Sequence, residues 1–221
     1  MGTTTLDAVP DKPRLRGVLH QWAIGCAVGA GVVLVGMSPT ARAAFGSAVF
    51  AVSLVTLFTV SATYHRINWA PGPRLWMRRA DHASIFVLIA GTYTPVALLG
   101  LPPEVGERLL VLIWSAAALG VGVSLFWPRR PKAVTAALAL TVGWLMVPYF
   151  GDVRRAVGLG VFSLIVGGGV AYSLGALAYA AKRPNLKPGV FGYHELFHAM
   201  TLVGASLHYA VVVCVLRATP G

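Results

Sequence analysis

The feature of this sequence that most constrains its fold is a series of seven apolar stretches. They cover approximately residues 17–37, 43–65, 80–100, 107–127, 132–150, 155–180 and 190–216. A helix needs about 20 mostly apolar residues to cross the hydrocarbon core of a bilayer. Because lipid offers no partners for free backbone groups, such stretches cross it as helices. The pattern therefore predicts an all-α integral membrane protein, a bundle of seven transmembrane helices.

The composition agrees with a membrane location and excludes other classes of protein. Of the 221 residues, 57% are hydrophobic and 11% are charged, whereas soluble domains carry about 25% charged residues. A soluble enzyme, a secreted disulfide scaffold and a disordered chain are excluded. The polar residues 1–16, with Pro10 and Pro13, are predicted to be a flexible cytoplasmic segment ahead of a transmembrane domain at 17–217. No cleavable signal peptide is expected, because the first apolar stretch is long enough to span.

The net charge of +11 lies in short basic clusters between the apolar stretches. A nucleic-acid partner is not expected, since such proteins gather basic residues on one face or stripe. If the N-terminus is cytoplasmic, thirteen basic residues fall inside and five fall outside. The excess of Lys and Arg in cytoplasmic loops therefore predicts a cytoplasmic N-terminus and an outside C-terminus. The five outside residues are Arg42, Arg108, Arg154, Arg155 and Arg217.

Few ionisable side chains fall within the apolar stretches, and each is a candidate for function because charge is costly in lipid. They are His20, His65, Asp81, His82, His194, Glu195, His198 and His208. In the predicted topology the second span ends, and the third and seventh begin, at the cytoplasmic face. The polar residues at these three span ends are therefore expected at one depth of the membrane.

The histidines at this depth have the spacing of a metal site. His194 and His198 are four residues apart and lie on one helix face, and His65 can add a third nitrogen from a facing helix. Three protein ligands and a water form an open zinc site, in which the pKa of the water falls to about 7. Asp81 is the candidate to orient or deprotonate that water. Ser61, one turn from His65, is the candidate to hydrogen-bond a ligand, the water or an oxyanion.

The other polar residues have less defined expected roles. His82 points away from the preceding aspartate and is expected to hydrogen-bond a neighbour. His20 is expected either to support a metal ligand or to replace one. His208 lies about 15 Å along the helix axis from His198 and cannot share its metal ion. Glu195 is expected to support the site or to face the cytoplasm at the interface.

The segment His194-Glu195-Leu196-Phe197-His198 also satisfies HExxH, the zinc protease pattern in which the glutamate is the general base. An intramembrane zinc protease usually adds an aspartate ligand from a later segment. No aspartate follows this motif, so the protease interpretation is not favoured.

Small residues and prolines predict where the helices approach closely or bend. Glycines permit close helix packing in membranes, and the candidates are Gly25 with Gly29, Gly120 with Gly122, and Gly167 to Gly169. Pro95 and Pro148 are expected to kink or end helices.

Three polar segments resemble those of a known family. They are Ser61-Ala62-Thr63-Tyr64-His65, the stretch Ala80 to Pro95 that begins Ala80-Asp81-His82, and the HExxH segment followed by His208. With them the sequence is similar to the bacterial hemolysin III proteins. These are relatives of the progestin and adipoQ receptor family, which includes the adiponectin receptors.

The resemblance implies a seven-helix bundle with a cytoplasmic N-terminus, in the inner membrane of a bacterium. It also implies a zinc ion in the cytoplasmic half of the membrane, with His65, His194 and His198 as ligands. Asp81 would hold the zinc-bound water and Ser61 would support the site. Glu195 departs from the pattern expected beside the first histidine of the pair, which leaves its role open.

Three functions remain as hypotheses. The first is hydrolysis of a lipid amide or ester by zinc-activated water, because the wider superfamily includes alkaline ceramidases and the adiponectin receptors are reported as ceramide hydrolases. The second is a receptor or membrane-homeostasis protein with structural zinc and a lipid ligand. The third is a pore-forming hemolysin, which an inner-membrane orientation disfavours.

Overall fold

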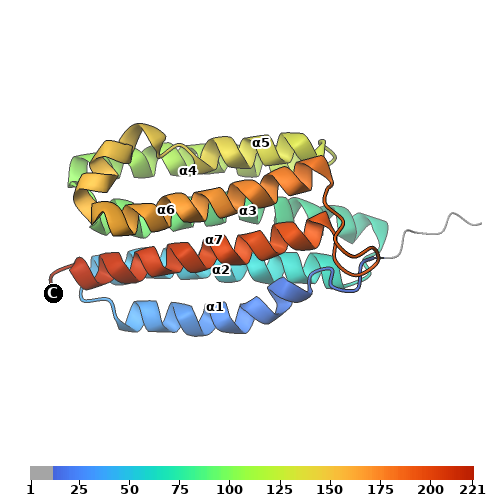
Figure 1. Cartoon of the computed structure of the whole chain (residues 1–221), viewed down its shortest axis with the longest axis horizontal. Helices are drawn as coiled ribbons and strands as arrows, with labels where there is room; N and C mark the ends of the chain where they lie inside the picture. The colour runs from blue at the N-terminus through green and yellow to red at the C-terminus, as the bar shows by residue number, and fades with distance from the viewer. Residues whose placement is uncertain (1–11) are drawn as a thin grey trace, which may run out of the picture.

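The computed structural model describes residues 12–221, which are helical apart from loops and one isolated β-bridge between Lys187 and Phe191. The helices are α1 (Val18–Gly36), α2 (Ala41–Arg66), α3 (Pro71–Leu99), α4 (Pro103–Phe126), α5 (Lys132–Gly143), α6 (Phe150–Ala181) and α7 (Tyr193–Ala218), with a 3-10 turn η1 (Val147–Tyr149). They run side by side, and the start of α1 and the C-terminus lie at opposite ends of the bundle (Figure 1).

Six helical stretches in the described residues are long and apolar enough to cross a membrane. Five of them are α1, α2, α3, α4 and α7, and the sixth runs through α5 and α6 from Lys132 to Ala181. Large apolar side chains also point outward, since Trp22 is 78% exposed and Phe126 is 89% exposed. Exposed apolar surface of this kind is typical of a contact with a membrane or with another protein. The chain is therefore an all-helical, multi-pass membrane protein.

The fifth expected span, 132–150, takes a different form. Helix α5 has only 12 residues, about 18 Å of helix, against a hydrocarbon core of about 30 Å. Pro148 lies in the turn η1, where its missing N–H interrupts helical hydrogen bonding. Tyr93 Oη donates to the Gly143 carbonyl at 2.6 Å and accepts from the Met146 N–H at 3.1 Å. This hydroxyl satisfies backbone groups that the end of α5 leaves free, as irregular backbone inside a membrane protein requires.

Two other helices differ from their expected spans. Helix α3 begins at Pro71 instead of residue 80, because proline is favoured in the first turn of a helix. Pro95 lies inside α3 without ending it. Helix α6 begins at Phe150 and is broken at Gly158, whose φ of 77° and ψ of 165° are not helical.

The interior consists of two apolar clusters that share two helices. One cluster packs α3 against α4 to α7, with Phe86 and Val211 among its buried members. The other packs α1 and α2 against α3 and α7, with Phe50 and Val212 among its buried members. Because α3 and α7 contribute to both clusters, they are the central helices. The polar residues near the start of each are thereby held inside the bundle.

Only some of the glycines expected at helix contacts lie at them. A Cβ on Gly25, Gly29 or Gly122 would meet no neighbouring atom within 4 Å. A Cβ on Gly120 would collide with the Phe86 ring, and one on Gly168 would collide with His208. Glycine is therefore required by tertiary packing at the latter two positions.

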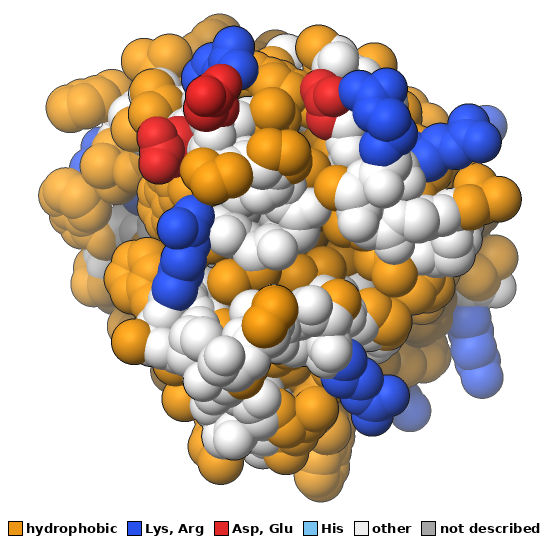
Figure 2. Space-filling model, turned by 90° about the vertical axis from the view of Figure 1, so that its left-hand side faces the viewer, with side chains coloured by type: hydrophobic (Ala, Val, Ile, Leu, Met, Phe, Trp, Pro, Cys, Tyr) orange, Lys and Arg blue, Asp and Glu red, His pale blue; other side chains and the backbone are white. Residues whose placement is uncertain are grey.

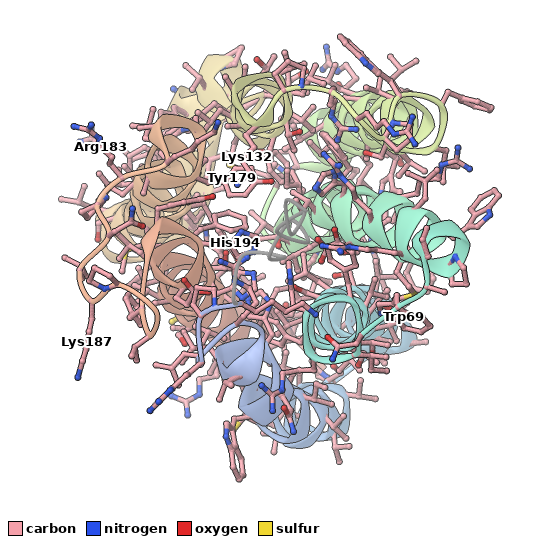
Figure 3. The ribbon with its side chains drawn as sticks, turned by 90° about the vertical axis from the view of Figure 1, so that its right-hand side faces the viewer. Trp69, Lys132, Tyr179, Arg183, Lys187 and His194 are labelled. Atoms are coloured by element: carbon pink, nitrogen blue, oxygen red, sulfur yellow. The ribbon has the colours of Figure 1, made fainter. Side chains whose placement is uncertain are left out.

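The two ends of the bundle differ in polar content. Figure 2 views the end predicted to lie outside, where acidic and basic side chains are scattered and no histidine is visible on this face. Two exposed ion pairs lie there: Arg155 with Asp152 at 2.5 Å, and Arg108 with Glu104 at 3.9 Å. The candidate site lies at the other end, which Figure 3 shows.

Residues 12–16 follow an ordered path across that other end. The Arg14 N–H donates to the Gly189 carbonyl at 3.0 Å, and Lys12 Nζ donates to Asn68 Oδ1 at 2.9 Å. This part of the predicted flexible segment is therefore attached to the α6–α7 and α2–α3 loops. Residues 1–11 of that segment lie outside the described residues.

Candidate metal centre

The three histidines predicted as metal ligands come together from two helices. His65 lies in the last turn of α2, and His194 and His198 lie in the first two turns of α7. All three are buried, with exposed fractions of 8%, 8% and 2%. One ligand atom from each lies within 4.8 Å of the others. Within residues 12–221, this is the one histidine, cysteine or carboxylate group with a geometry able to hold a metal ion.

The donor chemistry and spacing of this group fit zinc. His65 Nε2 and His194 Nε2 are 3.1 Å apart, near the about 3.3 Å between two nitrogens on a tetrahedral ion with Zn–N bonds of about 2.0–2.1 Å. Imidazole is a common zinc ligand. The triad is therefore able to hold a metal ion.

Asp81 and Ser61 lie beside the triad. Asp81 Oδ2 is 3.8 Å from His65 Nε2, too far for a direct hydrogen bond. Ser61 precedes His65 by one turn on the same face of α2 and is 3% exposed. Both residues line the same cavity as His194 and His198. The structure therefore brings both predicted catalytic residues to the predicted metal ligands.

The cavity at this site has a volume of about 130 Å³. Its wall at the metal group is formed by His194, His198, Asp81 and Ser61. The cavity extends between the helices to Tyr93, Trp144 and His208. Most of the remaining wall is apolar, with Leu57, Ile85, Leu88, Ile89, Leu140 and Phe197 among the lining side chains. This shape matches a ligand with one polar end and an apolar chain.

His20 contacts the triad without joining the group able to hold a metal. Its ring stacks on His198, with a centroid distance of 3.9 Å and an interplanar angle of 9°. Phe58 packs against it at 5.0 Å. His20 is 2% exposed, and neither of its ring nitrogens has a partner among the described residues. Its position is that of a packing support for His198.

His82 and His208 both line the cavity but do not belong to the group able to hold a metal ion. The expected hydrogen bond from His82 to a neighbour is not formed through Nδ1, which is buried and unpartnered within residues 12–221. His208 Nε2 lies 3.1 Å from the Ile165 carbonyl. His208 lies ten residues further along α7 than His198, which is about 15 Å of helix. It is therefore too far away to join the metal group.

Glu195 is buried and paired, not exposed at the interface. It is 1% exposed, and its Oε1 accepts from Arg16 Nε at 2.5 Å. Its Oε2 accepts from the Gly192 N–H at 2.9 Å, at the start of α7. Both oxygens are occupied outside the metal group, so the structure does not place Glu195 as the base of an HExxH protease. This bond to the N-cap N–H is one half of a capping box, and Gly192 has no side chain for the other half.

Sequence reasoning missed two cations near the cavity. Arg130, between α4 and α5, is 2% exposed, and its Nη2 donates to Ser124 Oγ at 3.0 Å. Lys132 Nζ donates to Tyr193 Oη at 2.6 Å and lies 4.8 Å from the centre of the Tyr179 ring. Both residues were expected in a cytoplasmic loop, and no local pattern indicates that a loop cation turns inward.

The fold and this site define a multi-pass α-helical membrane protein with a buried triad of histidines able to hold a metal ion. Residues 9–209 match the family described as Haemolysin-III related. The chain belongs to this family, which confirms the resemblance seen in the sequence.

Relatives from bacteria and a plant agree with this assignment. The chain is 32% identical over 168 residues to the Hemolysin-3 homolog of Bacillus subtilis (strain 168), covering 76% of this chain and 74% of that protein. It is 30% identical over 173 residues to Hemolysin-3 of Bacillus cereus, covering 78% and 76%. It is 31% identical over 182 residues to the heptahelical transmembrane protein ADIPOR2 of Oryza sativa subsp. japonica, covering 74% and 79%. No solved structure matches.

Proposed function

We propose that this protein is a zinc-dependent hydrolase of a lipid amide or ester, similar to a ceramidase, in the inner membrane of a bacterium. The observation that carries the proposal is the three-histidine group beside Asp81, at the polar end of a mainly apolar cavity. Zinc at His65, His194 and His198 would act as a Lewis acid and lower the pKa of its water to about 7.

The proposal gives each polar side chain of this site a role. Asp81 Oδ2 lies 3.8 Å from a ligand nitrogen, and this carboxylate would accept a proton from the attacking water as general base. The Ser61 hydroxyl can donate a hydrogen bond to the carbonyl oxygen of the substrate as negative charge develops there. The apolar cavity wall excludes bulk water and holds the acyl chain.

The proposed orientation keeps the N-terminus in the cytoplasm and the C-terminus outside, with seven crossings. Helix α1 begins at one end of the bundle, and α7 ends at the opposite end (Figure 1). This arrangement supports an odd number of crossings. The site then lies in the cytoplasmic half of the bundle, at the end where most basic residues lie.

A lipid receptor or membrane-homeostasis protein is the second candidate, because the same apolar cavity also suits a ligand that is bound and not cleaved. A pore-forming hemolysin has no specific observation in its favour. The name Hemolysin-3 describes the bacterial relatives and is no observation on this chain.

The test combines metal analysis with turnover. Purified, zinc-loaded protein is incubated with a broad panel of ceramides and acyl lipids, and released fatty acid is measured beside Asp81→Asn. Release by the unaltered protein and its loss in the variant support the hydrolase. No release from any lipid contradicts it and leaves the receptor. Dye leakage from liposomes that persists in His194→Ala supports the pore.

A further inference from the structure

We propose that the cavity contains a second subsite, on the walls formed by α3 and α5, that binds the phosphate group or a similar oxyanion of a lipid head. The cavity residues of this subsite are His82 and Thr135, and Arg78 lies one turn before His82 on α3. This inference rests on the proposed function, because it names the class of lipid that the same cavity takes.

Two buried polar groups line this part of the cavity without partners. His82 on α3 is 6% exposed and Thr135 on α5 is 3% exposed. His82 Nδ1 and Thr135 Oγ1 form no hydrogen bond within the described residues, and both residues line the cavity that also contains Asp81 and His194. Because an unpaired buried polar group is destabilising, these two groups indicate a ligand that hydrogen-bonds to them.

Cations gather around the same two residues. Arg78 precedes His82 by four residues on α3, so both lie on one helix face. Lys132 precedes Thr135 by three residues on α5, so these two residues also share one helix face. Across residues 12–221, neither Arg78, Arg130 nor Lys132 forms an ion pair with a carboxylate within 4.0 Å. Asp81 is the one carboxylate that lines the cavity.

Arg130 is a further cation of this region, buried between α4 and α5 two residues before Lys132. Its guanidinium is buried and donates to the Val123 and Trp127 carbonyls and to Ser124, while its Nε is unpartnered in the described chain. The carbonyl end of α4 offsets part of the charge. Burial, together with the charge of Arg78, nevertheless lowers the pKa of Arg130, because a desolvated cation without a counter-ion is disfavoured.

These cations differ from the ordinary basic residues of a cytoplasmic face. In Figure 3, Lys132 lies toward the centre of the bundle with Tyr179 and His194, whereas Arg183 and Lys187 lie at its edge. Lys132 is held inward by its hydrogen bond to Tyr193 and by the faces of two tyrosine rings. An oxyanion accepts hydrogen bonds from several cations at once. The apolar remainder of the cavity would hold the chain of the same lipid.

The test measures binding without turnover, using full-length protein in neutral phosphatidylcholine nanodiscs. Hexadecyl phosphate is compared with hexadecanol, which has the same chain and no charge. The proposal expects the phosphate to bind more tightly. Arg78→Gln should weaken its binding about tenfold, as the loss of one charge-assisted hydrogen bond predicts. Arg74→Gln is the matched control, because Arg74 is an exposed arginine one turn before Arg78 on the same helix.

Three outcomes overturn the proposal. One is equal binding of the alcohol and the phosphate. Another is binding that is lost in His65→Ala but kept in Arg78→Gln, which places the anion on the metal. The last is displacement by an equal concentration of inorganic phosphate, which assigns the subsite to a free oxyanion and not to a lipid. None of these depends on hydrolysis, so a failure here is distinct from a failure of the proposed function.

Thr135→Val gives an independent check, since valine has the shape of threonine without the hydroxyl. If Thr135 Oγ1 has no hydrogen-bond partner in the ligand-free protein, this variant should raise the melting temperature of that protein. It should also weaken binding of hexadecyl phosphate. A lower melting temperature of the ligand-free variant would show that the hydroxyl already has a partner and would contradict the subsite.

Discussion

His65 Nε2 and His194 Nε2 lie 3.1 Å apart, although 129 residues separate them in the chain. Two imidazole nitrogens at this distance share either one hydrogen bond or one cation. The additional presence of His198 within 4.8 Å favours the cation. The relationship makes the metal content of the protein the first quantity to measure.

We predict that His65→Ala and His198→Ala abolish stoichiometric zinc binding, because each removes one of three protein ligands. Elemental analysis of the purified variants provides the measurement. His208→Ala is the matched control: it removes a buried histidine of α7 outside the metal group and should keep the zinc. Loss of zinc in the control alone would place the site elsewhere.

Asp81→Asn should retain zinc while lowering lipid turnover about 10²–10⁴-fold, the contribution typical of a general base. The asparagine keeps the shape of the side chain but cannot accept a proton. Fatty-acid release is measured beside metal content in the same preparation. Unchanged turnover in a zinc-loaded variant would remove Asp81 from the chemistry.

Glu195→Gln should destabilise the protein by about 3 kcal/mol, because breaking a buried ion pair leaves its partner uncompensated. The affected partner is Arg16, whose side chain is 22% exposed. Glu104→Gln is the matched control, since that carboxylate is 91% exposed in its pair with Arg108, and it should change stability by less than about 0.5 kcal/mol. Thermal unfolding in detergent distinguishes the two. Equal stabilities of the two variants would contradict this role of Glu195.

His20→Phe should preserve zinc affinity better than His20→Ala. The phenylalanine ring keeps an aromatic face against His198, which now stacks at 3.9 Å, whereas alanine leaves a space beside it. Competition with a zinc chelator measures the affinities. If His20→Phe loses zinc and His20→Ala keeps it, His20 does not act by packing.

The topology can be tested with reporters fused to the C-terminus. Seven crossings from a cytoplasmic N-terminus place the C-terminus outside, where a periplasmic phosphatase reporter is active. Six crossings place it inside, where green fluorescence from a fused fluorescent protein is expected instead. Because α5 is short, this measurement decides whether the α5–α6 stretch crosses once or twice.

More of the candidate site than of its surroundings could be predicted from the sequence. The depths of His65, Asp81 and His194 follow from counting residues along helices of fixed rise, so their meeting at one level was accessible from the sequence. The pairing of Glu195 with Arg16 was not, because it joins residues 179 positions apart through the path of a polar segment. The same holds for the inward turn of Arg130.

The sequence by itself determined that this chain is an all-helical membrane protein, and it identified the histidines that share a depth. Apolar length and helical spacing are properties of single segments, and the bilayer fixes the depth of each segment along the membrane normal. Only the tertiary structure decided which faces meet around that axis: the stack of His20 on His198, the shortening of α5 with Tyr93 at its end, and the unpartnered His82 and Thr135 in the cavity wall. Rotation and lateral packing of helices depend on all neighbouring side chains at once, so no single segment encodes them.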